Sequence, residues 1–413
     1  MNGLLRYLET SYTAYQAVEN AVAYLREQGF SELSEQSAWN LSEGGKYYVV
    51  RNGSSIVAFT VGKGNAYKII ASHTDSPALK LKEHAALHSA PFTKLNTEPY
   101  GGALYYTFFD RPLKIAGRIV REKDGILTAQ NYVSDTTVSI PSLAVHMNRD
   151  ANDKFAPNPQ VDLLPLYSLG EQELDLNGAI SYDLFAVCAE APFVSGANNE
   201  FVSSPRVDNL TSVYSSLCAL AQSEHDGICV AACFDNEEVG SRTLQGAGSD
   251  FLANVLERIA VARGLSKEDY LCALASSFVL SLDNAHSLHP NHPEKCDPTN
   301  RAVMGGGVVI KGHAGGAYTT DALSSAIVKK IFADANVRYQ TFYNRSDMRS
   351  GSTLGAISIS QVSIPSADLG IAQLAMHSAM ELFAAEDYFE LEKGLSAFYD
   401  STIELHGNTV RIK

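Results

Sequence analysis

Apolar and polar positions near the start of the chain follow first a helical and then a strand-like pattern. Apolar or aromatic side chains recur at helical spacing over residues 4–28 and stop before Gly29, which predicts one amphipathic helix. Two strand-like runs follow, separated by the turn signal Asn52-Gly53, and the apolar run AYKIIAS at 66–72 predicts a buried strand. The chain therefore begins with a helix and the first strands of a sheet.

A different pattern occupies residues 86–195. Short apolar segments alternate there with glycine and proline, which predicts a β-rich insertion domain. Beyond it, helical patterns lie at 210–222, 251–264 and 321–335, and strand patterns lie at 228–234, 278–283, 307–311 and 357–364. Such alternation is typical of helices packed on a mixed, largely parallel sheet. The predicted fold class is α/β, with a discontinuous domain of residues 1–85 and 196–413.

Composition narrows the class of protein. The 413 residues allow two or three domains of roughly 150 residues, and 45% hydrophobic with 19% charged residues indicates a globular chain. A net charge of -14 gives no basic surface for nucleic acid or an anionic membrane. We expect a cytoplasmic protein, because no apolar run approaches the roughly 20 residues of a membrane span. The six cysteines contain no C-x-x-C pair that would indicate a thiolate zinc site.

The first candidate for chemistry is the segment ASHTDSP, directly after a predicted strand. It places His73 and Asp75 at the carboxyl end of that strand, where α/β sheets build their sites. The Asp75 carboxylate could form a hydrogen bond with the imidazole of His73 and fix its tautomer, as the hydrogen-bond partners of metal-binding histidines do. The simpler alternative is a histidine at a strand end with an aspartate in the following turn.

Carboxylates crowd the end of a second predicted strand. Asp235, Glu237 and Glu238 follow the apolar run at 228–234. Adjacent glutamates at such a point repel each other unless a cation or a proton lies between them. A salt-bridged surface loop is the alternative, but the apolar run behind these residues favours a site that faces inward.

The strand predicted at 278–283 ends at Asp283, and three histidines follow it. His286, His289 and His292 are spaced by three residues, but Pro290 breaks the helix that would align them. We therefore favour Asp283 as a metal ligand, expect His289 and His292 to be structural or exposed, and leave the role of His286 open.

Three other features are ambiguous on their own. Asp208 or Asn209 could simply be the N-cap of the helix that follows. His377 lies in a nearly charge-free run, where a lone histidine is usually a core residue. His84 and His88 have the spacing of a helical metal pair, but a glutamate precedes the pair instead of following its first histidine, so we assign the pair to the surface.

Together, the candidate residues fit one catalytic arrangement. Two divalent ions roughly 3.5–4 Å apart need a bridging carboxylate, a further carboxylate and an imidazole for each ion, and a base for the attacking water. Nitrogen and oxygen ligands without thiolate suit zinc, with cobalt or manganese as alternatives. The sequence has no G-x-S-x-G elbow and no H-E-x-x-H motif, so the rival hydrolase chemistries are poorly supported.

These segments resemble the aspartyl aminopeptidases, a family of cocatalytic zinc metallopeptidases that remove N-terminal acidic residues from peptides. The similarity runs almost from end to end and is carried, in the family's order, by ASHTDSPALKLK, IPSLAVHMNRDANDKFAPN, SSPRVDNLTSVYSSL, CFDNEEVGSRTLQGAGSD, LSLDNAHSLHPNHPEK, GVVIKGHAGGAYTTDA and LGIAQLAMHSAMEL. The resemblance implies an α/β catalytic domain formed from both ends of the chain and an inserted, mainly β dimerisation domain.

The resemblance also assigns the metal ligands. It makes Asp208 the carboxylate that bridges two divalent ions, expected to be Zn²⁺. His73 and Asp283 complete one metal site, and Glu238 and His377 complete the other. By this resemblance the family's members hold two such ions in each subunit and assemble as homo-oligomers of twelve subunits.

The remaining roles implied by the resemblance concern catalysis and substrate. Glu237 becomes the general base, with Asp75 as a second catalytic residue. His146 in the insertion is expected to reach the active site of a neighbouring subunit. The substrate contacts implied within one subunit are His286, Lys311 and Tyr318.

Specificity for N-terminal Asp or Glu needs a local cation, because a net charge of -14 disfavours an anionic peptide at long range. Lys311 is the candidate, since an ammonium in a partly desolvated pocket could pair with the substrate's carboxylate. The segments GHAGGAYTTDA and RSDMRSGSTLGAISIS near this pocket depart from the family's commoner sequence. A dinuclear metal aminopeptidase of neutral or broad specificity and a non-catalytic peptide-binding shell are the alternatives.

Overall fold

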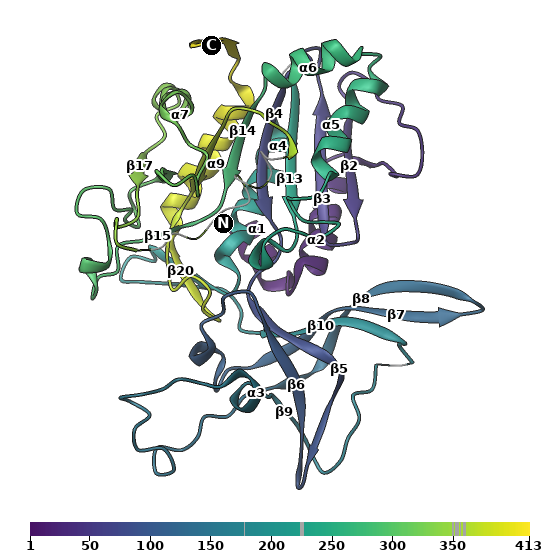
Figure 1. Ribbon diagram of the computed structural model, residues 1–413, viewed down its shortest axis with the longest axis vertical. Helices are drawn as coiled ribbons and strands as arrows, with labels where there is room; N and C mark the ends of the chain where they lie inside the picture. Colours follow the sequence, from purple (N-terminus) through teal and green to yellow (C-terminus); the bar gives the residue numbers. More distant parts are fainter. Residues whose placement is uncertain (177, 224–226, 349–350, 352–354, 356, 358–360) are drawn as a thin grey trace.

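A nine-stranded sheet forms the centre of the larger part of the molecule (Figure 1). The computed structural model describes residues 1–413 apart from 177, 224–226, 349–350, 352–354, 356 and 358–360. In spatial order the strands are β1 (Ser31–Glu32), β2 (Lys46–Arg51), β3 (Ser55–Val61), β13 (Ile228–Phe234), β4 (Tyr67–His73), β14 (Phe278–Leu282), β18 (Ser366–Gly370), β16 (Val308–Lys311) and β17 (Tyr339–Phe342). The central strands β13, β4, β14 and β18 run parallel, whereas β3 is antiparallel to β13. This arrangement confirms the predicted α/β class with a mixed, largely parallel sheet.

Helices cover both faces of this sheet. Along β13, Cys229 and Cys233 point into one apolar core, while Val230 and Phe234 point into another, as the period of two requires. The first core also contains residues of α1 (Asn2–Thr10), α2 (Ala14–Glu27), α4 (Val207–Gln222), α7 (Ala322–Asp334) and α9 (Ala385–Asp400). The second contains residues of α5 (Phe251–Ala262) and α6 (Lys267–Ala275).

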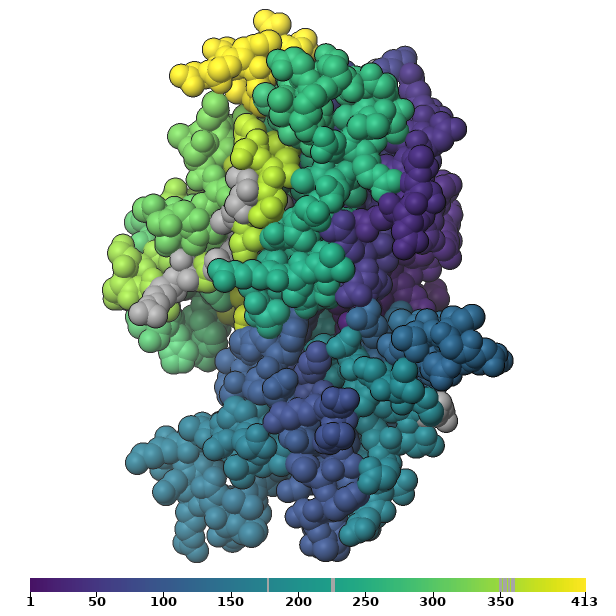
Figure 2. Space-filling model, turned by 45° about the vertical axis from the view of Figure 1, so that its right-hand side comes forward, coloured from purple at the N-terminus to yellow at the C-terminus, as the bar shows by residue number. Residues whose placement is uncertain are grey.

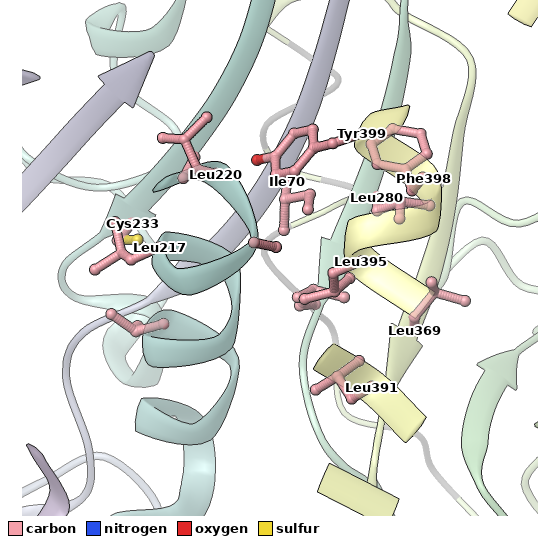
Figure 3. Packing of buried hydrophobic residues seen from close by; sticks show 14 of the residues in the cluster. Ile70, Leu217, Leu220, Cys233, Leu280, Leu369, Leu391, Leu395, Phe398 and Tyr399 are labelled. Atoms are coloured by element: carbon pink, nitrogen blue, oxygen red, sulfur yellow. The ribbon is translucent and has the colours of Figure 1, made fainter. Parts of the chain in front are cut away.

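The packing of α4 and α9 fixes the layer on which the site depends. Figure 3 shows Leu217 and Leu220 of α4 on one side of the core and Leu395 of α9 on the other, with Ile70 of β4 between them. The hydroxyl of Tyr399 donates to the main-chain carbonyl of Val230 at 2.7 Å, so α9 is also tied to β13 by a hydrogen bond. The start of α4 is held against the carboxyl end of β14, because Asn209 Nδ2 donates to the main-chain carbonyl of Leu282 at 2.8 Å.

Two expectations about elements differ from the structure. The helix predicted over residues 4–28 is two helices, because Thr13 is extended (φ -140°, ψ 175°) and begins a new turn after Ser11 closes α1. The run at 357–364, expected to be a strand, lies partly outside the described residues, and the sheet strand that follows it is Ser366–Gly370.

A second, six-stranded sheet is antiparallel throughout and is built from residues 78–188 (Figure 1). Its spatial order is β8 (Ile126–Val138), β7 (Leu113–Lys123), β10 (Ser181–Cys188), β5 (Ala78–Ser89), β6 (Phe92–Tyr100) and β9 (Leu166–Leu169). Since β5 crosses the predicted boundary at residues 85 and 86, we propose an insertion that starts at Ala78 and ends at Cys188. Figure 2 shows its blue and teal residues gathered at one end of the molecule.

Smaller elements complete the chain. A five-stranded sheet contains β11 (Phe193–Ser195), β12 (Phe201–Ser204), β20 (Glu381–Ala384), β19 (Ala372–Leu374) and β15 (Ala285–His286). The other elements are α3 (Pro159–Asp162), η1 (Tyr105–Phe108), η2 (Glu237–Val239), η3 (Pro293–Lys295) and the hairpin of β21 (Ile403–His406) and β22 (Thr409–Ile412). Within the described ranges, no helix is long and apolar enough to cross a membrane.

Candidate metal centre

The sheet order brings three polar segments to one edge. Because β13, β4 and β14 are parallel neighbours, their carboxyl ends meet, as expected for a site in an α/β sheet. His73 is the last residue of β4, the pair Glu237 and Glu238 follows β13, and Asp283 follows β14. Asp208 enters from the start of α4, and His377 comes from the turn between β19 and β20.

The backbone around these residues is unusual. Arg206, Asn236 and His377 have positive φ angles of 59°, 63° and 66°, each of which costs an L-residue of this kind on the order of 1–3 kcal/mol. The three positions lie beside or at Asp208, the glutamate pair and His377 itself. Such strain persists where surrounding contacts impose it, and its concentration here marks a functional site.

The side chains form two groups that share Asp208. The ligand atoms of His73, Asp208 and Asp283 lie within 4.8 Å of one another, and so do those of Asp208, Glu238 and His377. Asp208 Oδ1 lies 3.3 Å from His73 Nε2, and Asp208 Oδ2 lies 3.6 Å from His377 Nε2. His73 Nε2 is 3.8 Å from Asp283 Oδ1, and His377 Nε2 is 3.5 Å from Glu238 Oε1. One carboxylate therefore faces two histidines with its two different oxygens.

Both histidines present the same nitrogen to the carboxylates. His73 Nδ1–H donates to the main-chain carbonyl of Asp75 at 3.1 Å, and His377 Nδ1–H donates to that of Gly102 at 3.1 Å. A hydrogen bond donated by Nδ1–H fixes the tautomer in which Nε2 carries a free lone pair. This tautomer can bind a metal through Nε2.

The residues present fit divalent metal ions. Asp208 Oδ1 and Glu238 Oε1 are buried and accept no hydrogen bond, and buried oxygens of this kind need a partner. Burial raises the pKa of Glu237 to about 8 and that of Glu238 well above its ordinary value. Burial alone would lower the pKa of His377, but the carboxylates of Asp208 and Glu238 raise it to about 10. The raised pKa values show that the clustered carboxylates favour bound positive charge. Divalent cations would supply that charge, and the nitrogen and oxygen donors suit zinc.

The carboxylate of Asp75 does not hold the imidazole of His73 as we expected from the sequence. Its carboxylate lies 3.4 Å from His73 Nδ1, farther than its main-chain carbonyl. The carboxylate instead accepts the main-chain N–H groups of Glu237 and Glu238, both at 3.1 Å, and the hydroxyl of Tyr100 at 2.7 Å. Asp75 therefore positions the glutamate pair.

Sequence reasoning missed Glu381, a buried carboxylate that holds the second group. Its Oε2 accepts the main-chain N–H of Asp208 at 2.9 Å, and its Oε1 accepts that of His377 at 2.7 Å. Gln373 Nε2 donates to Oε1 at 3.2 Å and completes the network. The signal that could have found Glu381 is a lone acidic residue within the apolar run around His377.

The residues expected to contact substrate within one subunit lie near the first group. Lys311 is 1% exposed, and its Nζ lies 3.3 Å from Asp283 Oδ2 and 4.9 Å from the ring centre of Tyr318. Burial alone would lower the pKa of Lys311, but the charge of Asp283 raises it, so the side chain is an ammonium. His286 is exposed at the end of β15.

The other histidines considered in the sequence analysis lie away from the two groups. His146 is exposed in the connection between β8 and α3, and no described hydrogen bond or ion pair joins it to the metal centre. His84, His88, His289 and His292 are exposed, as expected from the sequence.

Comparison with known proteins identifies the class. The family profile described as aminopeptidase I zinc metalloprotease (M18) matches residues 7–179 and 171–399. A probable M18 family aminopeptidase 2 of Clostridium novyi is 42% identical over 97% of this chain and 98% of its own length. The cryo-EM structure of the Ape4 and Nbr1 complex has a TM-score of 0.91 at 33% identity, covering 96% of this chain and 84% of that chain. The structure of the S. cerevesiae mApe1 dodecamer has a TM-score of 0.82 at 26% identity, covering 96% and 95%.

The fold, the ligand cluster and these matches define a metal-dependent peptidase. The chain belongs to the M18 family of zinc aminopeptidases, which are hydrolases that act on peptides. Because this family includes the aspartyl aminopeptidases, the resemblance seen in the sequence motifs is confirmed at the level of the family.

Proposed function

We propose that the protein removes N-terminal Asp or Glu residues from peptides with the help of two divalent metal ions, expected to be zinc. The observation that carries the dinuclear proposal is the placement of Asp208, whose two carboxylate oxygens face His73 and His377 separately. Asp283 would complete one site and Glu238 the other. When bound, the ions would polarise the scissile carbonyl and lower the pKa of the attacking water.

Glu237 is the proposed general base. Its main-chain N–H is held by Asp75 Oδ1 at 3.1 Å, and its ligand oxygen lies within 4.8 Å of those of His73 and Glu238. From this position the Glu237 carboxylate would take a proton from the attacking water and deliver it to the leaving amine. Asp75 supports this step by fixing the backbone of the glutamate pair rather than by moving a proton.

Lys311 is the basis for acidic specificity. Its ammonium donates to Asp283 Oδ2 and to the main-chain carbonyl of Asn284 at 3.4 Å, which leaves one of its three N–H groups for substrate. The site lies at the buried edge of the sheet, where a charge-assisted hydrogen bond is about twice as strong as a neutral one. If the side-chain carboxylate of a substrate bound there, the α-amino group of that substrate would lie beside the metal ligands.

The test is hydrolysis of Asp-, Glu-, Leu- and Lys-p-nitroanilide by the metal-loaded enzyme and by the Lys311→Met variant. The substitution should lower kcat/KM for the acidic substrates by about 10–100-fold and leave the Leu substrate nearly unchanged. Lys68→Met is the matched control, since Lys68 is also buried in the sheet but binds the carbonyls of Tyr399 and Ser401.

Two outcomes would redirect the proposal. A wild-type preference for Leu or Lys would favour the alternative of neutral or broad specificity. Equal losses on all substrates, together with a lower metal content, would show that Lys311 acts through Asp283 on the metal site and not on the substrate.

We further propose that the enzyme works as a homo-oligomer in which His146 reaches a neighbouring active site. The exposed apolar side chains beside His146 support a protein contact: Leu143, Val145 and Met147 are 55%, 54% and 74% exposed. The relative from S. cerevesiae with this fold is a dodecamer. Light scattering of the purified protein would give the subunit number.

Mixing two inactive variants tests whether His146 acts in trans. Glu237→Gln removes the base, and His146→Ala removes the contributed histidine, so assemblies of either variant alone should be poorly active. After subunit exchange, a mixed assembly contains sites with both groups intact, and activity should return. No recovery in verified mixed assemblies would overturn the role of His146 in trans while leaving the metal centre untouched.

A further inference from the structure

The segment between β16 and α7 brings Tyr318 to the ammonium of Lys311. β16 ends at Lys311, and the N-cap residue of α7 is Asp321. Three of the residues at 312–320 are glycines, and glycine leaves a backbone free to adopt many conformations. The position of Tyr318 therefore depends on the contacts that this segment makes with the sheet.

A buried carboxylate on the neighbouring strand β18 makes such contacts. Asp368 is 0% exposed, and its Oδ2 accepts the main-chain N–H of Thr319 at 2.6 Å and the hydroxyl of Thr319 at 2.7 Å. The main-chain N–H of Asp368 donates to Thr320 Oγ1 at 2.8 Å. Hydrogen bonds to an ionised acceptor are roughly twice as strong as neutral ones, so Asp368 holds residues 319 and 320 against the sheet.

A second residue of β18 strengthens this attachment. Ser366 Oγ donates to Thr319 Oγ1 at 2.7 Å. The hydroxyl of Thr319 therefore accepts from Ser366 while it donates to Asp368. A hydroxyl with both a donor and an acceptor partner is fixed in orientation, and the residue next to Tyr318 is thereby tied to two positions on one strand.

Asp368 also lies directly opposite Lys311. The two residues are partners in the antiparallel pairing of β16 and β18, and partners of this kind share one face of a sheet. Lys311 Nζ lies 4.9 Å from the ring centre of Tyr318, which is 9% exposed. Burial alone would lower the pKa of Lys311, but the charges of Asp283 and, less strongly, of Asp368 raise it. One carboxylate thus acts on the ammonium and on the segment that covers it.

We infer that Asp368 is a positioning residue for recognition of the N-terminal side chain of the substrate. Through Thr319 it keeps the ring of Tyr318 over the ammonium of Lys311, and Asp368 itself does not touch the substrate. A ring in this place excludes water, so the attraction between the ammonium and a substrate carboxylate is stronger than in bulk solvent. The inference rests on the proposed role of Lys311 in acidic specificity.

The test compares kcat/KM for Asp- and Leu-p-nitroanilide in the metal-loaded Asp368→Ala variant. Without its anchor, Tyr318 no longer covers the ammonium, and kcat/KM for the Asp substrate should fall about 10–100-fold, mainly through KM. The metal content should stay unchanged, and the Leu substrate should lose less than about threefold. An equal loss on both substrates would show a general disturbance of the fold and overturn the inference.

A milder substitution keeps the test decisive if Asp368→Ala does not fold. Thr319→Val removes only the hydroxyl, so selectivity for Asp over Leu should fall about threefold to tenfold, whereas Thr319→Ser should keep it. Unchanged selectivity in Thr319→Val would overturn the inference. Asp269→Ala is the matched control, because Asp269 Oδ2 accepts the main-chain N–H and the hydroxyl of Ser266 at 3.1 and 2.6 Å. This pair lies at the start of α6, at the end of the molecule away from the inserted sheet (Figure 1).

Nitration of Tyr318 separates this inference from the proposed specificity. Tetranitromethane should modify Tyr318 at least about threefold faster in Asp368→Ala than in the wild type and in Asp269→Ala, because the ring is released from the sheet. Mass mapping of peptides gives the rate at this residue. Faster nitration would support the hold on Tyr318 whatever substrate the wild type prefers. An unchanged rate would overturn the inference even in an enzyme that is selective for Asp.

Discussion

The two ligand groups of the metal centre share Asp208 but are held by different parts of the fold. His73 and Asp283 stand at the ends of the neighbouring parallel strands β4 and β14, and their side chains are 1% and 14% exposed. His377 stands in a turn, its side chain is 30% exposed, and its Nδ1 depends on the carbonyl of Gly102 within the proposed insertion. The sheet fixes the first group, whereas the second depends on a few hydrogen bonds.

This difference predicts which of the two groups is more sensitive to substitution of a neighbouring side chain. In the first group, the ladder of β4 and β14 positions the ligands, so the contribution of any one neighbouring side chain is small. In the second group, one side chain, that of Glu381, accepts the main-chain N–H groups of both His377 and Asp208. We therefore expect the second group to lose its ion first during titration with a chelator.

Removing the shared ligand should have the largest effect, because it breaks both groups at once. Asp208→Asn keeps the shape of the side chain but replaces one acceptor oxygen by a donor. Both ions should be lost, and kcat/KM should fall by about 10³-fold or more, since the metals supply several kcal/mol of transition-state stabilisation. Metal analysis after gel filtration checks the first expectation. Retention of one ion at wild-type affinity would show that Asp208 is not a bridge.

Removing the base should leave both groups intact. Glu237→Gln is expected to lower kcat by roughly 10²–10⁴-fold while the enzyme keeps both ions. This combination separates proton transfer from metal binding. The main alternative is that Glu237 is a metal ligand, because its carboxylate lies within 4.8 Å of the ligand atoms of His73 and Glu238. A loss of activity that only follows the loss of metal would favour this alternative.

Removing Glu381 should affect the second group selectively. In Glu381→Gln the amide can accept one of the two main-chain N–H groups but not both, so His377 or Asp208 loses its support. The affinity for the more weakly bound ion should fall about 10–100-fold, with the first ion unaffected, as measured by calorimetric zinc titration. Asp387→Asn is the matched control, because Asp387 also accepts two main-chain N–H groups, from Gly305 and Gly307, away from the ligands.

The sequence indicated the candidate ligands that the structure brings together better than the residues that support them. His73, the glutamate pair and Asp283 each follow an apolar strand, so a local pattern was enough to select them. Asp208 looked like an N-cap and His377 like a core residue, and only the resemblance to a family joined them to the others. Glu381 left only a weak local signal, a lone acidic residue in an apolar run, because one of the two groups that it holds, the main-chain N–H of Asp208, lies far away in the sequence.

Element boundaries failed for a related reason. The apolar spacing continues through residues 11–13, so periodicity alone predicts one helix where tertiary contacts impose a break between α1 and α2. Similarly, β5 pairs with β10 about a hundred residues later in the chain, as the Lys80 and Phe185 partners show. Pairing over such a distance supports the proposed start of the insertion at Ala78, and no pattern near residue 85 contains that information.

The smallest effect should come from Tyr100, which supports the glutamate pair through Asp75. Its hydroxyl donates to Asp75 Oδ2 at 2.7 Å and accepts from Asn236 Nδ2 at 2.8 Å. Tyr100→Phe removes both hydrogen bonds, each worth about 0.5–1.5 kcal/mol, but only the one to Asp75 acts on the glutamate pair, so kcat/KM should fall about threefold to tenfold. Tyr106→Phe is the control, since the Tyr106 side chain is 59% exposed. Because Asp75 holds both the proposed base Glu237 and the proposed ligand Glu238, a modest loss of affinity for the second ion should accompany the fall in kcat/KM, as measured by calorimetric zinc titration. Unchanged activity and metal affinity would show that Asp75 positions the pair without the help of Tyr100.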